Sequence, residues 1–363
     1  MSLKLGSITT VVVSSPEAAK IVLQKHDLAF SSRTIPSAAA ALNHEEFSMV
    51  WLPVENQWRK LRKICKEQMF SVARLDASQG VRREKLQKLS EYVKECSETG
   101  RAVDIGEAAF TTSLNLMSAT LFSMDFAQFN SDTSQEMKDV VWGVMECIGS
   151  PNFADFFPDE KLKSGGGKDD LVEALIELSQ RDDAELSRND VKHLLLRRNQ
   201  KLNRRKQPCP KDISRLPYLQ AVVKKTFRLH PAAPFLVPHK AVSDIEINGY
   251  MVPKDAQILV NVWASGRDPY KWVESDAFVP ERFLEHNMID YRGKDFELIP
   301  FGAGRRICPG LPLAHRMVHL ILATLIHNFG WELEIKSKEI DMNEKFGLTL
   351  QKAISLRAIP TKL

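Results

Sequence analysis

The chain has 363 residues, of which 44% are hydrophobic and 26% charged, and its formal net charge is +4. This is an ordinary globular composition with enough chain for a large core, and the mild charge does not indicate a nucleic-acid partner. The five cysteines are scattered and lack C-x-x-C spacing, which argues against a disulfide framework or a zinc site and for a reducing compartment.

No apolar run approaches the roughly 18 residues of a membrane span, and no secretory signal opens the sequence. We therefore expect a protein that is soluble or only peripherally attached to a membrane.

In the first part of the chain, residues 1–14 predict two strands around Gly6, because apolar and β-branched residues flank a turn residue. A helix start follows at Ser15, which precedes a proline and an acid. Residues 31–52 show no periodicity and are expected to be irregular, with exposed aromatic residues at Phe47 and Trp51. Apolar residues at helical spacing predict helices at residues 57–69, 82–99 and 105–126.

Two internal segments break this pattern. Residues 159–168 contain three consecutive glycines and predict a flexible linker. Residues 192–211 form a basic junction, with seven Lys or Arg and no acid between 192 and 206. Such a run is usually a solvated or disordered face. A nucleic-acid patch is the alternative, but no aromatic residues are interleaved for base stacking, and we expect no nucleic-acid partner.

The second half continues with a helix over residues 218–229, a hairpin centred on Asn248-Gly249, a strand over 258–263 and a helix over 313–329. Short strands are expected around Leu348, Leu350 and Ile354. The whole predicts one mainly α domain, residues 1–363, with a small β subdomain.

Residues 301–310 read Phe-Gly-Ala-Gly-Arg-Arg-Ile-Cys-Pro-Gly. They contain one cysteine, which follows two arginines and precedes a predicted helix start. Cationic neighbours and a helix N-terminus both favour a thiolate. A dinucleotide-binding fingerprint is one alternative, but it would need glycine where Ile307 stands. A buried structural cysteine in a glycine-rich turn is the other.

The spacing F-x-x-G-x-R-x-C-x-G, at Phe301, Gly304, Arg306, Cys308 and Gly310, resembles the haem-binding signature of the cytochrome P-450 (haem-thiolate monooxygenase) superfamily. The phrases T-F-R-L-H-P, P-E-R-F and F-G-L-T-L at residues 226–231, 280–283 and 346–350 are similar to plant microsomal members, above all the geraniol- and nerol-hydroxylating type.

The resemblance implies a P-450 fold with haem as cofactor and Cys308 as its iron ligand. Phe301 and Gly310 belong to the cofactor-binding motif. The positions that match propionate contacts are Trp58, Arg62, His239 and Arg306. Without the cysteine motif, Trp58 and Arg62 would indicate only an amphipathic helix with a solvated basic face. The positions that match the substrate pocket are Phe235, Leu236, Val237, Phe346 and Leu348.

The implied reaction is the hydroxylation of a small lipophilic, terpenoid-like substrate with O2 and electrons from NADPH–cytochrome P-450 reductase. The family works at the cytosolic face of the endoplasmic reticulum membrane, and its N-terminal anchor is missing from this sequence.

The fold is expected to be incomplete. The family's A-G-x-D/E-T-T segment, which lies on the central oxygen-activating helix, should follow residues 194–196, but Arg197-Arg198-Asn199 stands there. Part of the substrate roof is missing at residues 159–168. We therefore expect inefficient turnover. The alternative is a non-enzymatic truncated relative that binds haem weakly or not at all.

The family's E-x-x-R ion pair is also altered, since Lys225 replaces the glutamate that would pair with Arg228 and Arg282. Removing one partner of a buried ion pair costs roughly 3–5 kcal/mol. An outward rotation of Lys225 would reduce this cost. A third hypothesis, a basic binding module formed by residues 192–206, predicts an affinity that falls steeply with salt.

Overall fold

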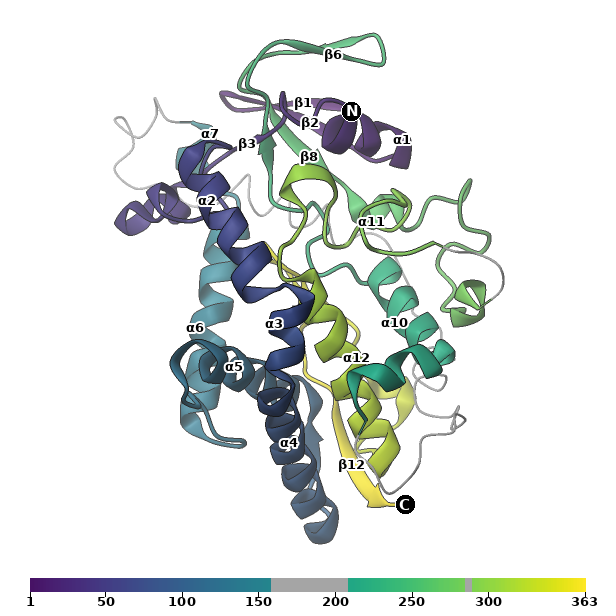
Figure 1. The fold of residues 1–363 in the computed structure, drawn as a ribbon. Helices are drawn as coiled ribbons and strands as arrows, with labels where there is room; N and C mark the ends of the chain where they lie inside the picture. The colour runs from purple at the N-terminus through teal and green to yellow at the C-terminus, as the bar shows by residue number, and fades with distance from the viewer. Residues whose placement is uncertain (158–207, 285–288) are drawn as a thin grey trace.

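The computed structural model describes residues 1–157, 208–284 and 289–363. It is a helical body with a small sheet at one end (Figure 1). The predicted linker at 159–168 and residues 192–207 of the predicted basic junction lie outside the described residues. Within the described residues, no helix is both long and apolar enough to cross a bilayer.

The sheet at the N-terminal end brings distant segments together. β1 (Ser2–Leu5) and β2 (Ile8–Val13) pair antiparallel around Gly6, whose φ is +56°, as predicted. β2 pairs in parallel with β8 (Gln257–Val260), and the order continues to β5 (His239–Lys240) and β3 (Ser32–Arg33). In the β3–β5 register Arg33 stands opposite His239.

A helix and an apolar layer support this sheet. α1 (Pro16–Lys20) is capped by Ser15, whose hydroxyl accepts from the backbone N–H of Ala18, and the chain continues as a π-helix over Ile21–Lys25. Val22 and Leu23 of this turn pack with Ile258 of β8 in one buried cluster. The same cluster includes Ile299 and Ala303, so the sheet packs against the segment at residues 299–303.

The helical body holds a second core. The helices of the body are α2 (Asn56–Ile64), α3 (Val72–Ala77), α4 (Gln79–Thr99), α5 (Ile105–Phe122), α6 (Asp132–Gly149), α7 (Phe153–Phe156), α10 (Pro217–Leu229), α11 (Val262–Ser265) and α12 (Leu311–Asn328). Leu89, Val93 and Cys96 on one face of α4 pack against Leu325 of α12. This confirms the predicted apolar face of residues 82–99.

The remaining strands are short. β9 (Phe329–Leu333) and β12 (Arg357–Lys362) pair antiparallel, and β4 (Val103–Asp104) pairs with β12. β6 (Ile245–Ile247) and β7 (Tyr250–Val252) form the predicted hairpin. β10 (Glu344–Lys345) pairs with β11 (Gln351–Lys352), so the prediction of strands at Leu348, Leu350 and Ile354 was wrong in position.

The segment expected to be irregular also differs. It contains a 3₁₀ helix over Ser37–Glu46, which an alanine run allows without helical amphipathicity. Trp51 is buried rather than exposed, whereas Phe47 is exposed as predicted. Trp51 is buried because this segment folds back onto the cysteine loop, a contact that local sequence does not encode.

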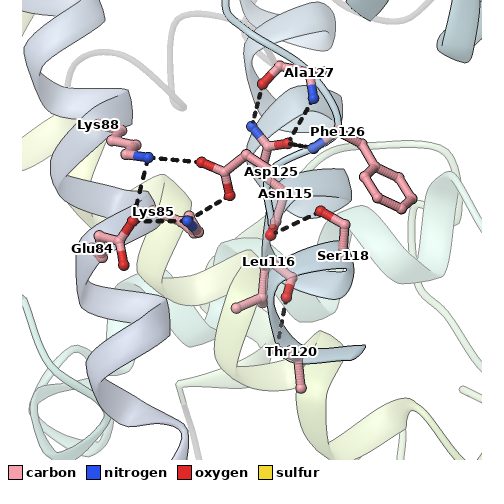
Figure 2. A network of polar contacts seen from close by, with 10 residues as sticks. All are labelled: Glu84, Lys85, Lys88, Asn115, Leu116, Ser118, Thr120, Asp125, Phe126 and Ala127. Atoms are coloured by element: carbon pink, nitrogen blue, oxygen red, sulfur yellow. Dashed lines mark hydrogen bonds and ion pairs between the residues drawn. The ribbon is translucent and has the colours of Figure 1, made fainter. Parts of the chain in front are cut away.

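A polar network ties α4 to the chain after α5 (Figure 2). Lys85 and Lys88 both form ion pairs with Asp125, at 2.6 and 2.7 Å. The buried amide of Asn115 donates to the carbonyl of Ala127 and accepts from the N–H groups of Phe126 and Ala127. A cavity of about 700 Å³ opens beside this network, lined among others by Tyr92, and it contains none of the predicted site residues.

Candidate functional site

The cysteine loop is held by close backbone packing. Gly304 has a φ of +65°, and a Cβ built there would lie 1.8 Å from the carbonyl oxygen of Leu23, so only glycine fits. The N–H of Cys308 donates to the carbonyl of Phe301 at 2.9 Å, which closes the loop. α12 begins three residues after Cys308.

The Cys308 side chain is exposed to solvent at the surface of the cysteine loop. The two arginines that the sequence places before it are engaged elsewhere: Arg305 pairs with Asp27 at 3.1 Å, and Arg306 donates to backbone carbonyls. Arg62 is the guanidinium group whose charge interacts with Cys308. Burial lowers the pKa of Arg62, and the sulfur groups of Cys308 and Cys65 oppose that shift.

The Trp58 ring joins α2 to the cysteine loop. Trp58 is buried, and its indole N–H donates to the carbonyl of Met49 at 3.1 Å. The guanidinium carbon of Arg62 lies 5.9 Å from the ring centroid, and that of Arg306 lies 5.3 Å from it. Both distances are within cation–π range, so the ring supports two cations at once.

Arg306 anchors the loop to two earlier segments. Its Nε donates to the carbonyl of Ser31 at 2.6 Å, and its Nη2 donates to that of Leu52 at 2.5 Å. Burial, with the charge of Arg62 added, lowers the pKa of Arg306 to about 10. The residues at 31–52 are therefore fixed by this contact, which no local pattern predicts.

Arg33 and His239 complete the cluster. An Nη of Arg33 donates to the carbonyl of Val237, and Nδ1–H of His239 donates to the carbonyl of Phe30 at 2.6 Å. Burial and the charge of Arg306 hold the pKa of Arg33 well below its usual value. Burial first, then the charge of Arg33, lowers the pKa of His239 well below its usual value. The buried Nε of Arg33 has no hydrogen-bond partner within the described residues.

These side chains form what we call the cationic cluster, defined by Arg33, Arg62, His239 and Arg306. Across residues 1–157, 208–284 and 289–363, no carboxylate forms a salt bridge with its three arginines. Buried charge without a counter-charge is costly. The cluster therefore fits an anionic group that the protein binds.

The space beside the thiol fits the same conclusion. A Cβ at Gly310 would meet nothing closer than the Sγ of Cys308, at 3.8 Å, and Phe70, at 4.0 Å. Glycine there keeps the approach to the sulfur free of a side chain. A thiol with open access beside carboxylate-binding cations suits a cofactor with a metal that binds sulfur and with carboxylate substituents, as haem has.

The predicted substrate-pocket residues lie on two neighbouring segments. Leu236 has a φ of +54° and packs against the sheet core, while Phe235 and Val237 beside it are half-buried. The N–H of Leu350 donates to the carbonyl of Ala232 at 2.7 Å, which joins the two segments. Leu348 is half-buried and Phe346 is half exposed.

The altered ion-pair position is buried. Lys225 and Arg228 on α10 are 0% and 1% exposed, so Lys225 has not rotated outward to reduce the cost of the altered pair. Arg228 donates to the carbonyls of Gly266 and Ser275, and its guanidinium carbon lies 4.9 Å from the Trp272 ring centroid. Burial, with the charges of Arg282 and Arg267 added, lowers the pKa of Arg228 to about 9.

The model of the family described as "Cytochrome P450" matches residues 1–190 and 196–356. This chain belongs to the cytochrome P450 family. P450 enzymes are haem-thiolate monooxygenases, and the cofactor is therefore haem. Membership confirms the predicted family and the mainly α fold with small sheets.

Curated P450 relatives cover the chain from end to end. Cytochrome P450 76T24 of Catharanthus roseus is 50% identical over 100% of this chain and 86% of its own length. Geraniol 8-hydroxylase of the same plant is 44% identical, and ferruginol synthase of Isodon rubescens is 42% identical, each over 100% of this chain and 87% of its own length. The alignments run over 430–432 residues against 363 here, so each holds positions without a counterpart in this chain.

Solved P450 structures share the fold. A zebrafish cytochrome P450 with progesterone superposes with a TM-score of 0.75 at 21% identity, covering 100% of this chain and 96% of that one. A zebrafish cytochrome P450 with abiraterone gives a TM-score of 0.73 at 20% identity, covering 100% of this chain and 95% of that one.

Trp58 and Arg62 on α2, His239 on β5 and Arg306 in the cysteine loop come from three separate segments, which the structure brings together. Arg62 of this group interacts with Cys308. Arg33 belongs to the same cluster but was missed from sequence. A buried arginine next to a two-residue strand carries no periodic signal, and only its pairing with His239 reveals it.

Proposed function

We propose that this P450 binds haem through Cys308 and hydroxylates a small lipophilic, terpenoid-like substrate with O2. The cationic cluster supports the proposal, because its arginines form no salt bridge with a carboxylate of the described residues and Arg62 interacts with Cys308 as well. The naming of relatives as geraniol 8-hydroxylase and ferruginol synthase supports a terpenoid substrate.

Each part of the site has a separate task in this proposal. Haem, when bound, supplies the oxygen-activating chemistry. The Cys308 thiol would give up its proton and ligate the metal, while its backbone N–H donates to the carbonyl of Phe301. Arg33, Arg62 and Arg306 would hold the carboxylates by charge-assisted hydrogen bonds. His239, whose Nδ1–H already donates to the carbonyl of Phe30, would lie beside them as a neutral imidazole. The apolar segment at residues 235–237 excludes water from the substrate.

Electrons would come from NADPH–cytochrome P450 reductase at the membrane surface of the endoplasmic reticulum. The outer face of α2 and the turn after it carries exposed basic residues, at Arg59, Lys60, Lys63 and Lys66. Such a face steers an acidic partner toward the thiolate side.

Haem binding without efficient turnover is the second candidate. The sequence holds no A-G-x-D/E-T-T segment to deliver protons to oxygen. In addition, Lys225 lies fully buried where the family has a glutamate. Both changes leave the cationic cluster and Cys308 in place, so they affect catalysis or folding rather than the cofactor contacts.

One experiment separates these functions. The full chain is produced with haem, and the spectrum of its reduced, CO-bound form is recorded beside that of Cys308→Ser. Thiolate ligation in the first and not in the second supports haem binding through Cys308. NADPH-dependent hydroxylation of geraniol with the reductase supports the enzyme, whereas NADPH consumption without product supports binding alone. No CO-bound spectrum in either protein would overturn both.

A further inference from the structure

Tyr291 is a buried tyrosine behind the cysteine loop. It is 2% exposed, in a loop where the sequence gives no periodic signal. Its ring meets Phe227 edge-on, with centroids 5.0 Å apart, and Phe301 at a tilt, with centroids 5.8 Å apart. Phe227 also meets Phe301 edge-on at 5.4 Å, so the three rings form a closed aromatic triangle.

The hydroxyl of Tyr291 points to α12. Its oxygen lies 2.5 Å from Nδ1 of His315, and the two rings are 6.0 Å apart. Burial lowers the pKa of His315 to about 4 and raises that of Tyr291, so at neutral pH the hydroxyl keeps its proton and donates to a neutral imidazole. Nδ1–H of His319 then donates to the carbonyl of His315 at 2.6 Å.

Tyr291 therefore contacts the chain on both sides of Cys308. Phe301 lies seven residues before the cysteine, and its carbonyl accepts the Cys308 N–H at 2.9 Å. His315 lies seven residues after it, on the helix that begins at Leu311. The Tyr291 ring fixes the first segment and the hydroxyl fixes the second.

We propose that Tyr291 is a positioning residue for Cys308, which holds the two segments flanking the ligand at a fixed separation through its ring contact to Phe301 and its hydrogen bond to His315. This rests on the proposed role of Cys308 as the haem ligand. The aromatic contact alone does not reach α12. The hydrogen bond adds that link, because the hydroxyl of the buried Tyr291 has its acceptor on α12.

The test is Tyr291→Phe in the full chain, which keeps the ring and removes the hydroxyl. Tyr270→Phe is the matched control, since Tyr270 is 95% exposed. Two readouts are used: the alkylation rate of Cys308 in the haem-free chain, followed by mass spectrometry of its peptide, and the thiolate-ligated share of the reduced, CO-bound form in the haem-loaded chain. We expect at least three-fold faster alkylation and a smaller thiolate-ligated share in Tyr291→Phe, with neither change in Tyr270→Phe.

His315 provides the second arm. His315→Leu should reproduce the effect of Tyr291→Phe, the double variant should add nothing further, and His315→Gln, which keeps an acceptor, should recover part of the wild-type rate. Wild-type alkylation rates in Tyr291→Phe, or effects of the two variants that simply add, would overturn the positioning role. The alkylation readout needs no haem, so a failure of the proposed haem ligation is seen separately as the loss of the CO spectrum in the wild type.

Discussion

Arg33 stands directly opposite His239 in the antiparallel pair of β3 and β5. Side chains at opposed positions of an antiparallel pair lie on the same face of the sheet, so the Arg33 guanidinium and the neutral His239 imidazole are fixed side by side. With Arg306 acting on both, the sheet edge holds positive charge that the described part of the chain does not neutralise.

Replacing Arg33 should therefore have opposite effects with and without the cofactor. In Arg33→Gln the haem-free chain should gain about 1 kcal/mol in free energy of unfolding, because an uncompensated buried charge is removed. Haem affinity should fall about ten-fold, the equivalent of one lost charge-assisted contact. Urea unfolding measures the free energy of unfolding, and a haem titration followed by absorbance measures the affinity. Arg74→Gln, at an exposed arginine, is the control. Equal haem affinity in the two variants would contradict a role of Arg33 in the site.

His239 predicts the direction of the pH dependence of stability. Its pKa in the folded chain lies well below its usual value of 6.5, so the unfolded chain binds the proton first as pH falls. The free energy of unfolding should therefore be highest above pH 6.5 and decrease below it. His315, with a pKa lowered to about 4, acts in the same sense between about pH 6.5 and pH 4.

Urea unfolding of the haem-free chain at pH 7.5 and pH 5 measures this difference. His239→Asn should reduce the difference, since one of the histidines with a lowered pKa is gone, while His315 and His319 remain. A stability that rises toward pH 5 in the wild type contradicts the assignment.

Lys225→Glu should stabilise the chain. The new carboxylate would lie one helical turn before Arg228, beside the arginines whose charges lower the pKa of Arg228. We expect a gain of about 2 kcal/mol in free energy of unfolding, less than the roughly 3–5 kcal/mol for one partner of a buried ion pair, because the new carboxylate must itself be desolvated. Lys224→Glu is the matched control, because Lys224 donates to the carbonyl of Ile289 at 2.8 Å and loses that bond. If Lys225→Glu is less stable than the wild type, the prediction is contradicted, and the surrounding residues stabilise the buried lysine better than a glutamate.

Asn115 should be the most sensitive position of the polar network in Figure 2. Asn115→Ala removes three hydrogen bonds and leaves the backbone groups of Phe126 and Ala127 without them. We expect a loss of roughly 2–3 kcal/mol, since buried groups left unsatisfied carry their full desolvation cost. Ser113→Ala, on the exposed side of the same helix, should change stability by less than about 0.5 kcal/mol. Thermal unfolding measures both, and equal losses would contradict the role of Asn115.

Much of the fold was predictable because its signals are local. The strands around Gly6, the Ser15 cap and the hairpin at Asn248-Gly249 each depend on a few consecutive residues, and each prediction was confirmed. Helix 105–126 was predicted four residues too long, because Ser123 takes a left-handed φ of +60° and ends α5 there.

The site was predictable only as far as its motif reached. Cys308, Trp58 and His239 follow from spacing and resemblance. Arg33 and Tyr291 do not, because their roles arise from a strand pair and from an aromatic packing between distant segments. The absence of the oxygen-activating helix stays a prediction, since the region where it should lie is outside the described residues.

The bond from Arg306 to the Ser31 carbonyl spans 275 residues, and the Thr10–Gln257 contact between β2 and β8 spans 247. During synthesis, one edge of β2 therefore stays unpaired until β8 is made, and the cationic cluster is complete only after the cysteine loop has been made. Contacts of such long range form slowly, and the unpaired edge of β2 is a place where another chain can pair. Haem can bind in this site only after these contacts have formed, so we expect the supply of haem during synthesis to influence how much of the chain aggregates.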